Sequence, residues 1–297
     1  MKQVTVLLSS YNGENYIEEQ LNSIITQKDC VVKILVRDDG SKDNTQEILE
    51  RYRQKGVLKW YTGDNLRPAK SFMHLIMNAP DSDYYALCDQ DDYWLDDKLS
   101  VAIKMLEATD YPSLYFSQTT LTDNKLSPIK TPIIDPKCTM GEALISYYAT
   151  GCTFVFNNKL RSEIIKHTPN YISMHDNWIY RVCLAVNGKV IFDPQSHILY
   201  RQHSNNVIGL KSSPWSVLKR RLNTIISPCR ERSKTAKELL LGYGDRMSDK
   251  NKELVLLAAN SPHSIRDRIK LIFKRDLKCP SRKCNITSRL AILFGIY

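Results

Sequence analysis

The segment Asp89-Gln90-Asp91-Asp92 gathers three carboxylates and one amide directly after an apolar run that is typical of a buried strand. Carboxylates crowded at the end of a strand repel one another and raise one another's pKa unless a cation lies between them. Because hard divalent cations prefer oxygen ligands, the spacing predicts a divalent metal site that involves Asp89 and Asp91. A solvated acidic turn is the alternative.

Strand and helix patterns alternate along the first 110 residues, and the elements that they predict would position these acids. Repeated strand–helix units predict a parallel sheet with right-handed crossovers and covering helices. Asp96 and Asp97 suit the first turn of a helix, and we assign them to it rather than to a metal. The predicted strands are 4–9, 31–36, 58–62 and 84–88, and the predicted helices are 14–26, one beginning near 42, 70–79 and one beginning at 96.

Polar side chains follow several of these strands. Tyr11, Asp38, Asp39, Asp89 and Asp91 all stand just past the end of a predicted strand. Ligands of open parallel sheets bind at the carboxyl ends of the strands, so we expect these side chains to meet at one edge. The glycines of a Rossmann dinucleotide site and the lysine loop of a Walker site are both missing. The sequence therefore predicts a nucleotide site of another kind.

The pattern changes after residue 113 to shorter strands and proline-containing loops. We expect helices at 141–148 and 159–167, and strands at 150–156, 190–192 and 197–200. His175 and Asp176 adjoin at the start of an apolar helical run. Asp176 there suits either a catalytic carboxylate or a helix N-cap. His203 stands in the polar loop that follows the last of these strands.

The composition is that of an ordinary globular protein, since 297 residues with 42% hydrophobic content can bury a substantial core. No signal-peptide pattern is evident, and no apolar run approaches the roughly 18 residues of a membrane-spanning helix. The eight cysteines are scattered singly, which favours a reducing compartment. We expect a cytoplasmic protein that does not cross a membrane.

Positive charge is concentrated in the last third of the chain. Residues 1–210 hold 22 Lys and Arg against 25 Asp and Glu, whereas residues 211–297 hold 20 against 7. Amphipathic segments at 215–226, 265–274 and 286–297 predict peripheral contact with the anionic inner face of the plasma membrane. Packing of these segments on the rest of the protein is the alternative. Nucleic acid is disfavoured as a partner, because the first 210 residues are slightly acidic and no binding motif is present.

Five motifs in sequence make the chain resemble the family 2 glycosyltransferases with the GT-A fold, and within them the rhamnosyltransferase-like enzymes of bacterial cell-surface polysaccharide synthesis. The resemblance runs from Val4 to about Gly209. Any one motif alone is weak, but their order and spacing are specific. The motifs are LSSYNG at 8–13, RDDGS at 37–41, DQDDYW at 89–94, HDNW at 175–178 and YRQHSNN at 200–206.

The resemblance implies a pocket for the nucleotide of a dTDP- or UDP-sugar. The first strand end supplies Ser9 and Tyr11, and the second supplies Asp38 and Asp39, at positions similar to those that hold the pyrimidine and ribose. An aspartate can accept a hydrogen bond from the N3–H of uracil or thymine, which gives a physical reason for preferring these bases. Further donor-binding positions are Asp89, nearer the ribose, and Gln90.

The resemblance also implies the groups that act on the diphosphate and the acceptor. Asp91, Asp89 and His203 would hold Mg²⁺ or Mn²⁺, which stabilises the leaving diphosphate. A histidine hydrogen-bonded within its own loop is the alternative for His203. Asp176 matches the catalytic base of an inverting transfer, and no second nucleophilic carboxylate is evident.

Two positions depart from the pattern of the family. Arg67 stands where relatives commonly have glycine, and His175 stands where many have glutamate. Arg67 or Lys70 would place positive charge near the diphosphate of the donor. The tail beyond Gly209 matches no family pattern, so its predicted role depends on composition alone.

We therefore predict an α/β fold, a GT-A-type, Rossmann-like, mostly parallel sheet with helices on both faces, and a basic C-terminal helical extension. Residues 1–112 would form the nucleotide-sugar-binding half, 113–210 the acceptor and catalytic half, and 211–297 the extension. The predicted reaction is metal-dependent, inverting transfer of L-rhamnose from dTDP-rhamnose to a lipid-linked polysaccharide. A UDP-hexose donor is one alternative, and a membrane- or nucleic-acid-binding module with an inactive domain is another. A nucleotidyltransferase is disfavoured because the glycine-rich loop it needs after the first strand is missing.

Overall fold

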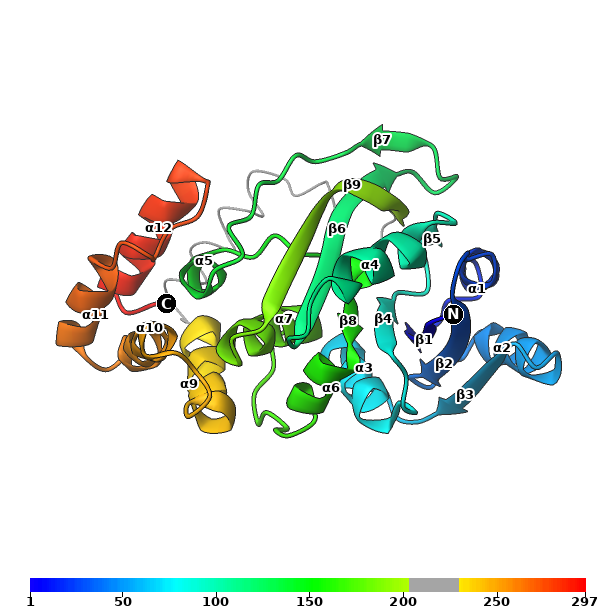
Figure 1. Ribbon diagram of the computed structural model, residues 1–297, viewed down its shortest axis with the longest axis horizontal. Helices are drawn as coiled ribbons and strands as arrows, with labels where there is room; N and C mark the ends of the chain where they lie inside the picture. The colour runs from blue at the N-terminus through cyan, green and yellow to red at the C-terminus, as the bar shows by residue number, and fades with distance from the viewer. Residues whose placement is uncertain (203–229) are drawn as a thin grey trace.

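The computed structural model describes residues 1–202 and 230–297, and its first third alternates strands and helices (Figure 1). The four strands predicted in this region are all present. The elements are β1 (Gln3–Ser10), α1 (Ile17–Ile25), β2 (Val31–Asp38), α2 (Thr45–Gln54), β3 (Leu58–Thr62), α3 (Arg67–Asn78), β4 (Tyr84–Cys88), β5 (Tyr93–Trp94) and α4 (Lys98–Glu107).

The remaining described residues complete the sheet and add a helical part at the C-terminal end. The elements are β6 (Ser113–Thr122), β7 (Pro128–Lys130), α5 (Met140–Ile145), the 3₁₀ turn η1 (Gly151–Thr153), β8 (Val155–Asn157), α6 (Asn158–Ile164), α7 (His175–Ala185), β9 (Lys189–Arg201), α9 (Glu231–Tyr243), α10 (Asp249–Asn260), α11 (Ile265–Ile272) and α12 (Arg282–Leu293).

The strands form one mixed sheet in the order β3-β2-β1-β4-β8-β6-β9-β5, with β7 paired to β6 beside this row. The strands β3, β2, β1 and β4 run parallel to one another, and β6 runs parallel to β9. β8 is antiparallel to both β4 and β6. The carboxyl ends of β1, β2 and β4 therefore lie at the same edge, as predicted from the strand–helix alternation.

Alternation of side chains along β1 explains why helices cover both faces of the sheet. Val4, Val6 and Leu8 are fully buried and share one core with α1, α2 and α4. Leu7 is also fully buried, but it belongs to the other core, which contains α3 and α7. A strand that is buried on both faces reads as a continuous apolar run, and β1 has this pattern.

Several boundaries differ from those predicted. Residues 150–156, expected as one strand, form η1 and then the short strand β8, and the strands expected at 190–192 and 197–200 are one continuous strand, β9. α3 begins at Arg67 rather than at 70, and α4 begins at Lys98 rather than at 96. The predicted domain boundary near residue 210 and the amphipathic segment 215–226 lie outside the described residues.

The C-terminal helices pack on the sheet domain and share its core. Leu239 of α9, Val255 of α10, Leu271 of α11 and Ile292 of α12 are buried in the same cluster as Trp178 of α7. The four helices lie together at one end of the molecule, opposite α1 and α2 (Figure 1). The packing that the sequence left open as an alternative for the tail is therefore present in residues 230–297.

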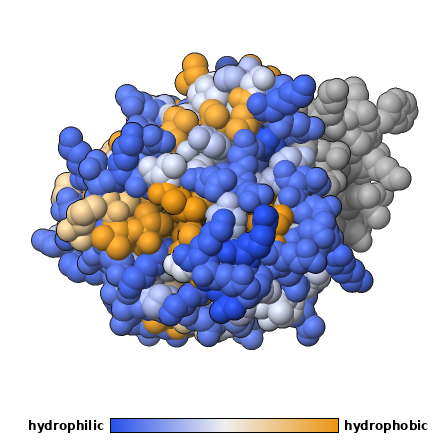
Figure 2. All heavy atoms as spheres, turned by 90° about the vertical axis from the view of Figure 1, so that its right-hand side faces the viewer, coloured by the Kyte–Doolittle hydropathy of each residue, from blue (hydrophilic) through white to orange (hydrophobic). Residues whose placement is uncertain are grey.

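The end that carries α1 and α2 is mainly hydrophilic, with a limited hydrophobic band (Figure 2). Among the described residues, no helix is both long enough and apolar enough to span a membrane.

Candidate active site

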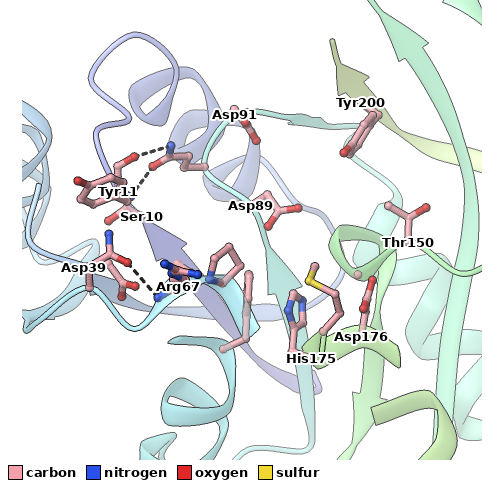
Figure 3. Close-up of a pocket in the computed structure, with 17 residues that line it drawn as sticks. Ser10, Tyr11, Asp39, Arg67, Asp89, Asp91, Thr150, His175, Asp176 and Tyr200 are labelled. Carbon is pink, nitrogen blue, oxygen red and sulfur yellow. Dashed lines mark hydrogen bonds between the residues drawn. The ribbon is translucent and has the colours of Figure 1, made fainter. Parts of the chain in front are cut away.

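A cavity of about 470 Å³ opens at the carboxyl ends of β1, β2 and β4, a size that suits a small-molecule ligand (Figure 3). The loops after these strands, the start of α3, the turn η1, the start of α7 and the end of β9 surround it. The lining residues are Ser9, Ser10, Tyr11, Asp39, Asn65, Arg67, Pro68, Phe72, Asp89, Gln90, Asp91, Thr150, Gly151, Met174, His175, Asp176 and Tyr200.

The loop after β1 is held to the acidic loop after β4. The Tyr11 N–H donates to Oε1 of Gln90 over 2.8 Å, and Nε2 of Gln90 donates to the Tyr11 carbonyl over 3.0 Å. A side chain at Gly13 would break this arrangement, because its Cβ would lie 2.3 Å from Gln90 Oε1. The Tyr11 side chain stays 44% exposed, so its ring is accessible to a ligand in the cavity.

Asp39 is held in place by buried partners. Its carboxylate forms an ion pair with Arg37, accepts a hydrogen bond from the Leu66 N–H over 2.9 Å and accepts another from the Ser71 hydroxyl over 2.8 Å. The Ser71 hydroxyl also lies 2.7 Å from that of Ser9, which links the ends of β1 and β2. Asp39 lines the cavity, and a carboxylate oxygen has more than one lone pair, so it can accept a further donor from a ligand.

Arg67 adopts a backbone conformation that favours glycine. Its φ is +62°, in the left-handed region, directly before the proline that opens α3. This geometry gives a physical reason for the glycine that the family resemblance leads us to expect here. The Arg67 side chain lines the cavity and therefore adds positive charge to a site that is otherwise acidic.

Asp89 and Asp91 lie together in the cavity, as the sequence predicted. Burial, followed by the charges of Asp91 and Asp176, raises the pKa of Asp89 to about 7. A cation between the carboxylates would offset both the burial and the repulsion, and oxygen ligands suit Mg²⁺ or Mn²⁺. The residues present therefore fit a divalent metal.

Asp92 lies behind this pair, outside the cavity lining. It is 1% exposed and accepts a hydrogen bond from the Arg201 N–H over 3.2 Å. Ligand-type atoms of Asp89, Asp92 and Cys152 lie within 4.8 Å of one another. Burial raises the pKa of the Cys152 thiol well above its usual value, and Mg²⁺ and Mn²⁺ prefer carboxylate oxygens to sulfur.

Asp176 enters the cavity from the first turn of α7. Its Oδ1 accepts a hydrogen bond from the Asn177 N–H over 2.6 Å, and burial raises the pKa of the carboxyl to about 6. In Figure 3 it lies beside His175 and on the other side of the cavity from Tyr11. A carboxylate with this pKa is ionised at neutral pH and still basic enough to accept a proton from a reacting hydroxyl.

Two predicted site residues do not line the cavity, and a third is not among the residues that the structure describes. Asp38 is fully buried beneath it and accepts hydrogen bonds from the Ser10 hydroxyl over 2.9 Å and the Ser41 N–H over 2.8 Å, so its contacts hold the turn after β2. Lys70 is exposed on α3 and does not line the cavity. His203 lies outside the described residues.

The structure also adds residues to which the sequence assigned no role in the site. Phe72, Thr150, Met174, His175 and Tyr200 line the cavity without having been assigned to it. Phe72 follows the apolar spacing of a helix and gives no sequence signal of its own. His175 did have a signal, because it adjoins Asp176 at the start of a helix.

The model of the family described as "Glycosyl transferase family 2" matches residues 5–164. This range covers more than half of the chain and contains the Asp39 and Asp89–Asp91 positions. The chain belongs to glycosyl transferase family 2. The nucleotidyltransferase alternative is thereby set aside.

Two curated relatives of this glycosyltransferase act on nucleotide sugars according to their names. The dTDP-rhamnosyl transferase RfbG of Shigella flexneri is 31% identical over 233 residues, which are 69% of this chain and 75% of RfbG. The UDP-Glc:alpha-D-GlcNAc-diphosphoundecaprenol beta-1,3-glucosyltransferase WfgD of Escherichia coli is 26% identical over 124 residues, which are 41% of this chain and 48% of WfgD.

Solved structures support the same fold. The crystal structure of S. aureus TarS residues 1–349 aligns with a TM-score of 0.60 at 15% identity, and the alignment covers 99% of this chain and 90% of that one. The expected GT-A fold is confirmed, and the chain is a glycosyltransferase with a nucleotide-sugar donor.

Proposed function

We propose that the glycosyltransferase moves a sugar from a pyrimidine nucleotide diphosphate to a hydroxyl with inversion at the anomeric carbon, in a metal-dependent reaction. The observation that carries this proposal is the shared cavity: Asp89 and Asp91 line it from β4, Asp39 from β2 and Asp176 from α7. One cavity therefore contains candidates for metal binding, base recognition and proton removal.

The nucleotide would bind at the side of the cavity formed by β1 and β2. The exposed ring of Tyr11 offers a surface for the base, and Asp39, fixed by Arg37 and Ser71, would accept the N3–H of thymine or uracil. We assign Asp38 to support of this side, because it is buried and holds the turn. Arg67 would lie near the diphosphate, and any contribution of Lys70 would come from outside the cavity lining.

Asp91 and Asp89 would hold Mg²⁺ or Mn²⁺, with His203 as a further ligand suggested by the family motif. When bound, such an ion neutralises charge on the leaving diphosphate. The Asp176 carboxylate would accept the proton of the acceptor hydroxyl while that oxygen forms a bond to the anomeric carbon. The bond from this carbon to the diphosphate oxygen breaks on the opposite side, and the nucleoside diphosphate leaves with the electron pair.

L-rhamnose from dTDP-rhamnose is the donor we favour. The similarity to RfbG supports it, because RfbG is named a dTDP-rhamnosyl transferase and matches over more of this chain than WfgD does. A UDP-hexose is the second candidate, supported by the name of WfgD. Both donors carry a pyrimidine that Asp39 would recognise in the same way.

A lipid-linked acceptor at a membrane surface is part of the proposal. The name of WfgD includes a diphosphoundecaprenol acceptor. On this chain, α11 and α12 each leave one apolar stripe exposed, with Phe273 79% and Phe294 69% accessible. Residues 264–297 hold nine Lys and Arg against two Asp and Glu. Exposed aromatic and aliphatic side chains beside basic ones suit the headgroup layer of an anionic membrane.

The C-terminal helices are connected to the acceptor side of the cavity. The Tyr297 hydroxyl donates to the Leu144 carbonyl of α5 over 2.6 Å, and the Ser288 hydroxyl of α12 donates to the Ile145 carbonyl over 3.4 Å. The segment that follows α5 leads to Thr150 and Gly151 in the cavity lining. A membrane bound at α11 and α12 would therefore lie on the side of the molecule from which Asp176 enters the cavity.

The test is release of nucleoside diphosphate from a panel of dTDP- and UDP-sugars, with Mg²⁺ or Mn²⁺ and membrane extracts that contain lipid-linked glycan. The proposal expects release from dTDP-rhamnose that needs both metal and extract. If only a UDP-hexose supports release, the proposed donor is wrong and the proposed mechanism stands. No release from any donor would overturn the proposed function.

A further inference from the structure

His175 is buried in the cavity wall without a partner for either ring nitrogen. It is 4% exposed, and neither Nδ1 nor Nε2 has a hydrogen-bond partner among the described residues. An unsatisfied buried polar atom costs about 1–3 kcal/mol. Two such atoms on one ring that lines a ligand cavity indicate that the missing partner is a ligand.

The ring is held in a fixed orientation. It stacks on Phe72 with ring centroids 4.0 Å apart and an angle of 27° between the planes. Behind it, Gly151 leaves the needed space, because a Cβ at that position would lie 2.8 Å from His175 Nε2 and 3.1 Å from the Cβ of Asp176. Nε2 therefore lies against Gly151, and the ring has little freedom to turn.

His175 is neutral in this position. Burial lowers the pKa of its imidazole to about 3, so one ring nitrogen donates and the other accepts at neutral pH. A sugar hydroxyl both donates and accepts, and it is therefore a matched partner. Pro68, Phe72 and Met174 line the cavity with His175, and such apolar side chains suit the C–H groups of a sugar ring.

We propose that His175 is a specificity-determining residue that binds one hydroxyl of the transferred sugar through its neutral ring. This inference rests on the proposed function, because it assigns the sugar of the nucleotide donor to the part of the cavity between Phe72 and Asp176. The nucleotide itself lies by Tyr11 and Asp39 in that assignment. His175 therefore affects recognition of the sugar and leaves recognition of the nucleotide unchanged.

Residue 175 adjoins Asp176, the proposed base, and this position favours a side chain without charge. A carboxylate at 175 would lie beside Asp176 and add to the charges of Asp89 and Asp91 in the same cavity. Like charges raise one another's pKa and would shift Asp176 further from its ordinary value. A neutral histidine offers the hydrogen bond without this added repulsion.

The experiment compares His175→Leu, which keeps a similar volume but no hydrogen-bonding group, with His175→Gln, which restores a donor and an acceptor. Affinity is measured for dTDP alone and for the active dTDP-sugar, and kcat/KM is measured for that sugar and for its single-deoxy analogues. Urea unfolding verifies that both variants are folded.

We expect both variants to bind dTDP within about twofold of the original affinity. His175→Leu should lower kcat/KM for the donor by about 10- to 100-fold, as expected for loss of a hydrogen bond to a buried group, and His175→Gln should recover part of it. For the original protein, one deoxy analogue should have a lower kcat/KM than the parent sugar. For His175→Leu, the same analogue and the parent sugar should have equal kcat/KM values.

If the original protein and His175→Leu discriminate equally against every deoxy analogue, the inference is overturned. A matched loss of affinity for dTDP alone would also overturn it, since the ring would then act on the nucleotide. Failure of the proposed function looks different, because no donor is then turned over. In that case binding still decides the role of His175. If the ring binds the sugar, the original protein binds the dTDP-sugar more tightly than dTDP, and this difference in affinity is smaller in His175→Leu; an unchanged difference overturns the inference.

Discussion

Replacing Asp176 by Asn should make the protein more stable and almost inactive. The pKa of Asp176 is raised by burial from 3.8 to about 6, so its ionised form is less stable in the folded chain than in the unfolded one. Each pH unit of difference corresponds to about 1.4 kcal/mol. Above pH 6 the ionised carboxylate therefore lowers the free energy of unfolding by up to about 3 kcal/mol.

Asn has nearly the same shape and no charge to bury. At pH 7.5, Asp176→Asn should raise the free energy of unfolding by up to about 3 kcal/mol, and the gain should shrink as the pH falls from 6 towards 4. Below pH 4 the original carboxyl is protonated in both states, and the difference should vanish. Loss of the base should lower the transfer rate by about 10²- to 10⁴-fold.

The assay is urea unfolding at several pH values together with nucleotide release. Asp43→Asn is a control for which we expect the opposite change in stability. Burial acts to raise the pKa of Asp43, but hydrogen bonds from Thr45 and from the Glu14 N–H outweigh it and lower the pKa. Asp43 therefore stabilises the fold above pH 4, and its loss should destabilise the protein at pH 7.5 without removing the base. Near-normal transfer by Asp176→Asn would refute its role as the base. A stability difference that stayed constant between pH 7.5 and 4.5 would refute the electrostatic explanation.

Three further predictions concern other parts of the molecule. Asp91→Asn should lower the metal-stimulated rate at least about 100-fold and raise the Mn²⁺ concentration needed for half activity, whereas an unchanged Mn²⁺ response would place the metal elsewhere. Gly151→Ala should lower transfer at least about tenfold while dTDP affinity is retained, because its Cβ would lie 2.8 Å from the His175 ring, and unchanged transfer would contradict this packing. Phe273→Glu should weaken sedimentation with anionic vesicles. Leu241 of α9 is 62% exposed and lies outside the basic segment 264–297, so Leu241→Glu should have little effect, and equal effects of the two variants would exclude α11 as the membrane contact.

Much of the sheet could be predicted because each strand is marked by a pattern within a short stretch of sequence. β3 and β4 were predicted at the exact bounds Leu58–Thr62 and Tyr84–Cys88, since each is a short apolar or β-rich run between turn residues. The acids at the ends of β2 and β4 were predicted for the same reason, because a strand end and a polar cluster are both visible along the chain. The common edge then followed from the parallel arrangement.

The rest of the site depends on contacts between distant segments. Asp38 and Asp39 are neighbours at one strand end, yet only Asp39 lines the cavity, because Asp38 points to Ser10 and the turn after β2. No pattern in the sequence separates the two. Phe72 likewise reads as a core position of α3, and only the packing of α3 against α7 brings it to His175.

The C-terminal half was harder to predict for a related reason. α9 and α10 were not anticipated, because they pack mainly on each other, and also on α11, α5 and α7, rather than showing a clear amphipathic pattern of their own. The 3₁₀ turn at Gly151–Thr153 was predicted as part of a strand, because in the sequence it leads directly into the apolar residues before and within β8. In both cases tertiary packing decides a structure that the local pattern leaves open.

The most direct measurement of the central claim is a crystal structure of the protein with dTDP and Mn²⁺, in which anomalous scattering locates the metal. The account predicts a Mn²⁺ peak at coordination distance from Asp91, a diphosphate bound to that ion, and a thymine base between Tyr11 and Asp39. A nucleotide bound outside this cavity, or a Mn²⁺ ion that does not contact Asp91 or Asp89, would contradict it.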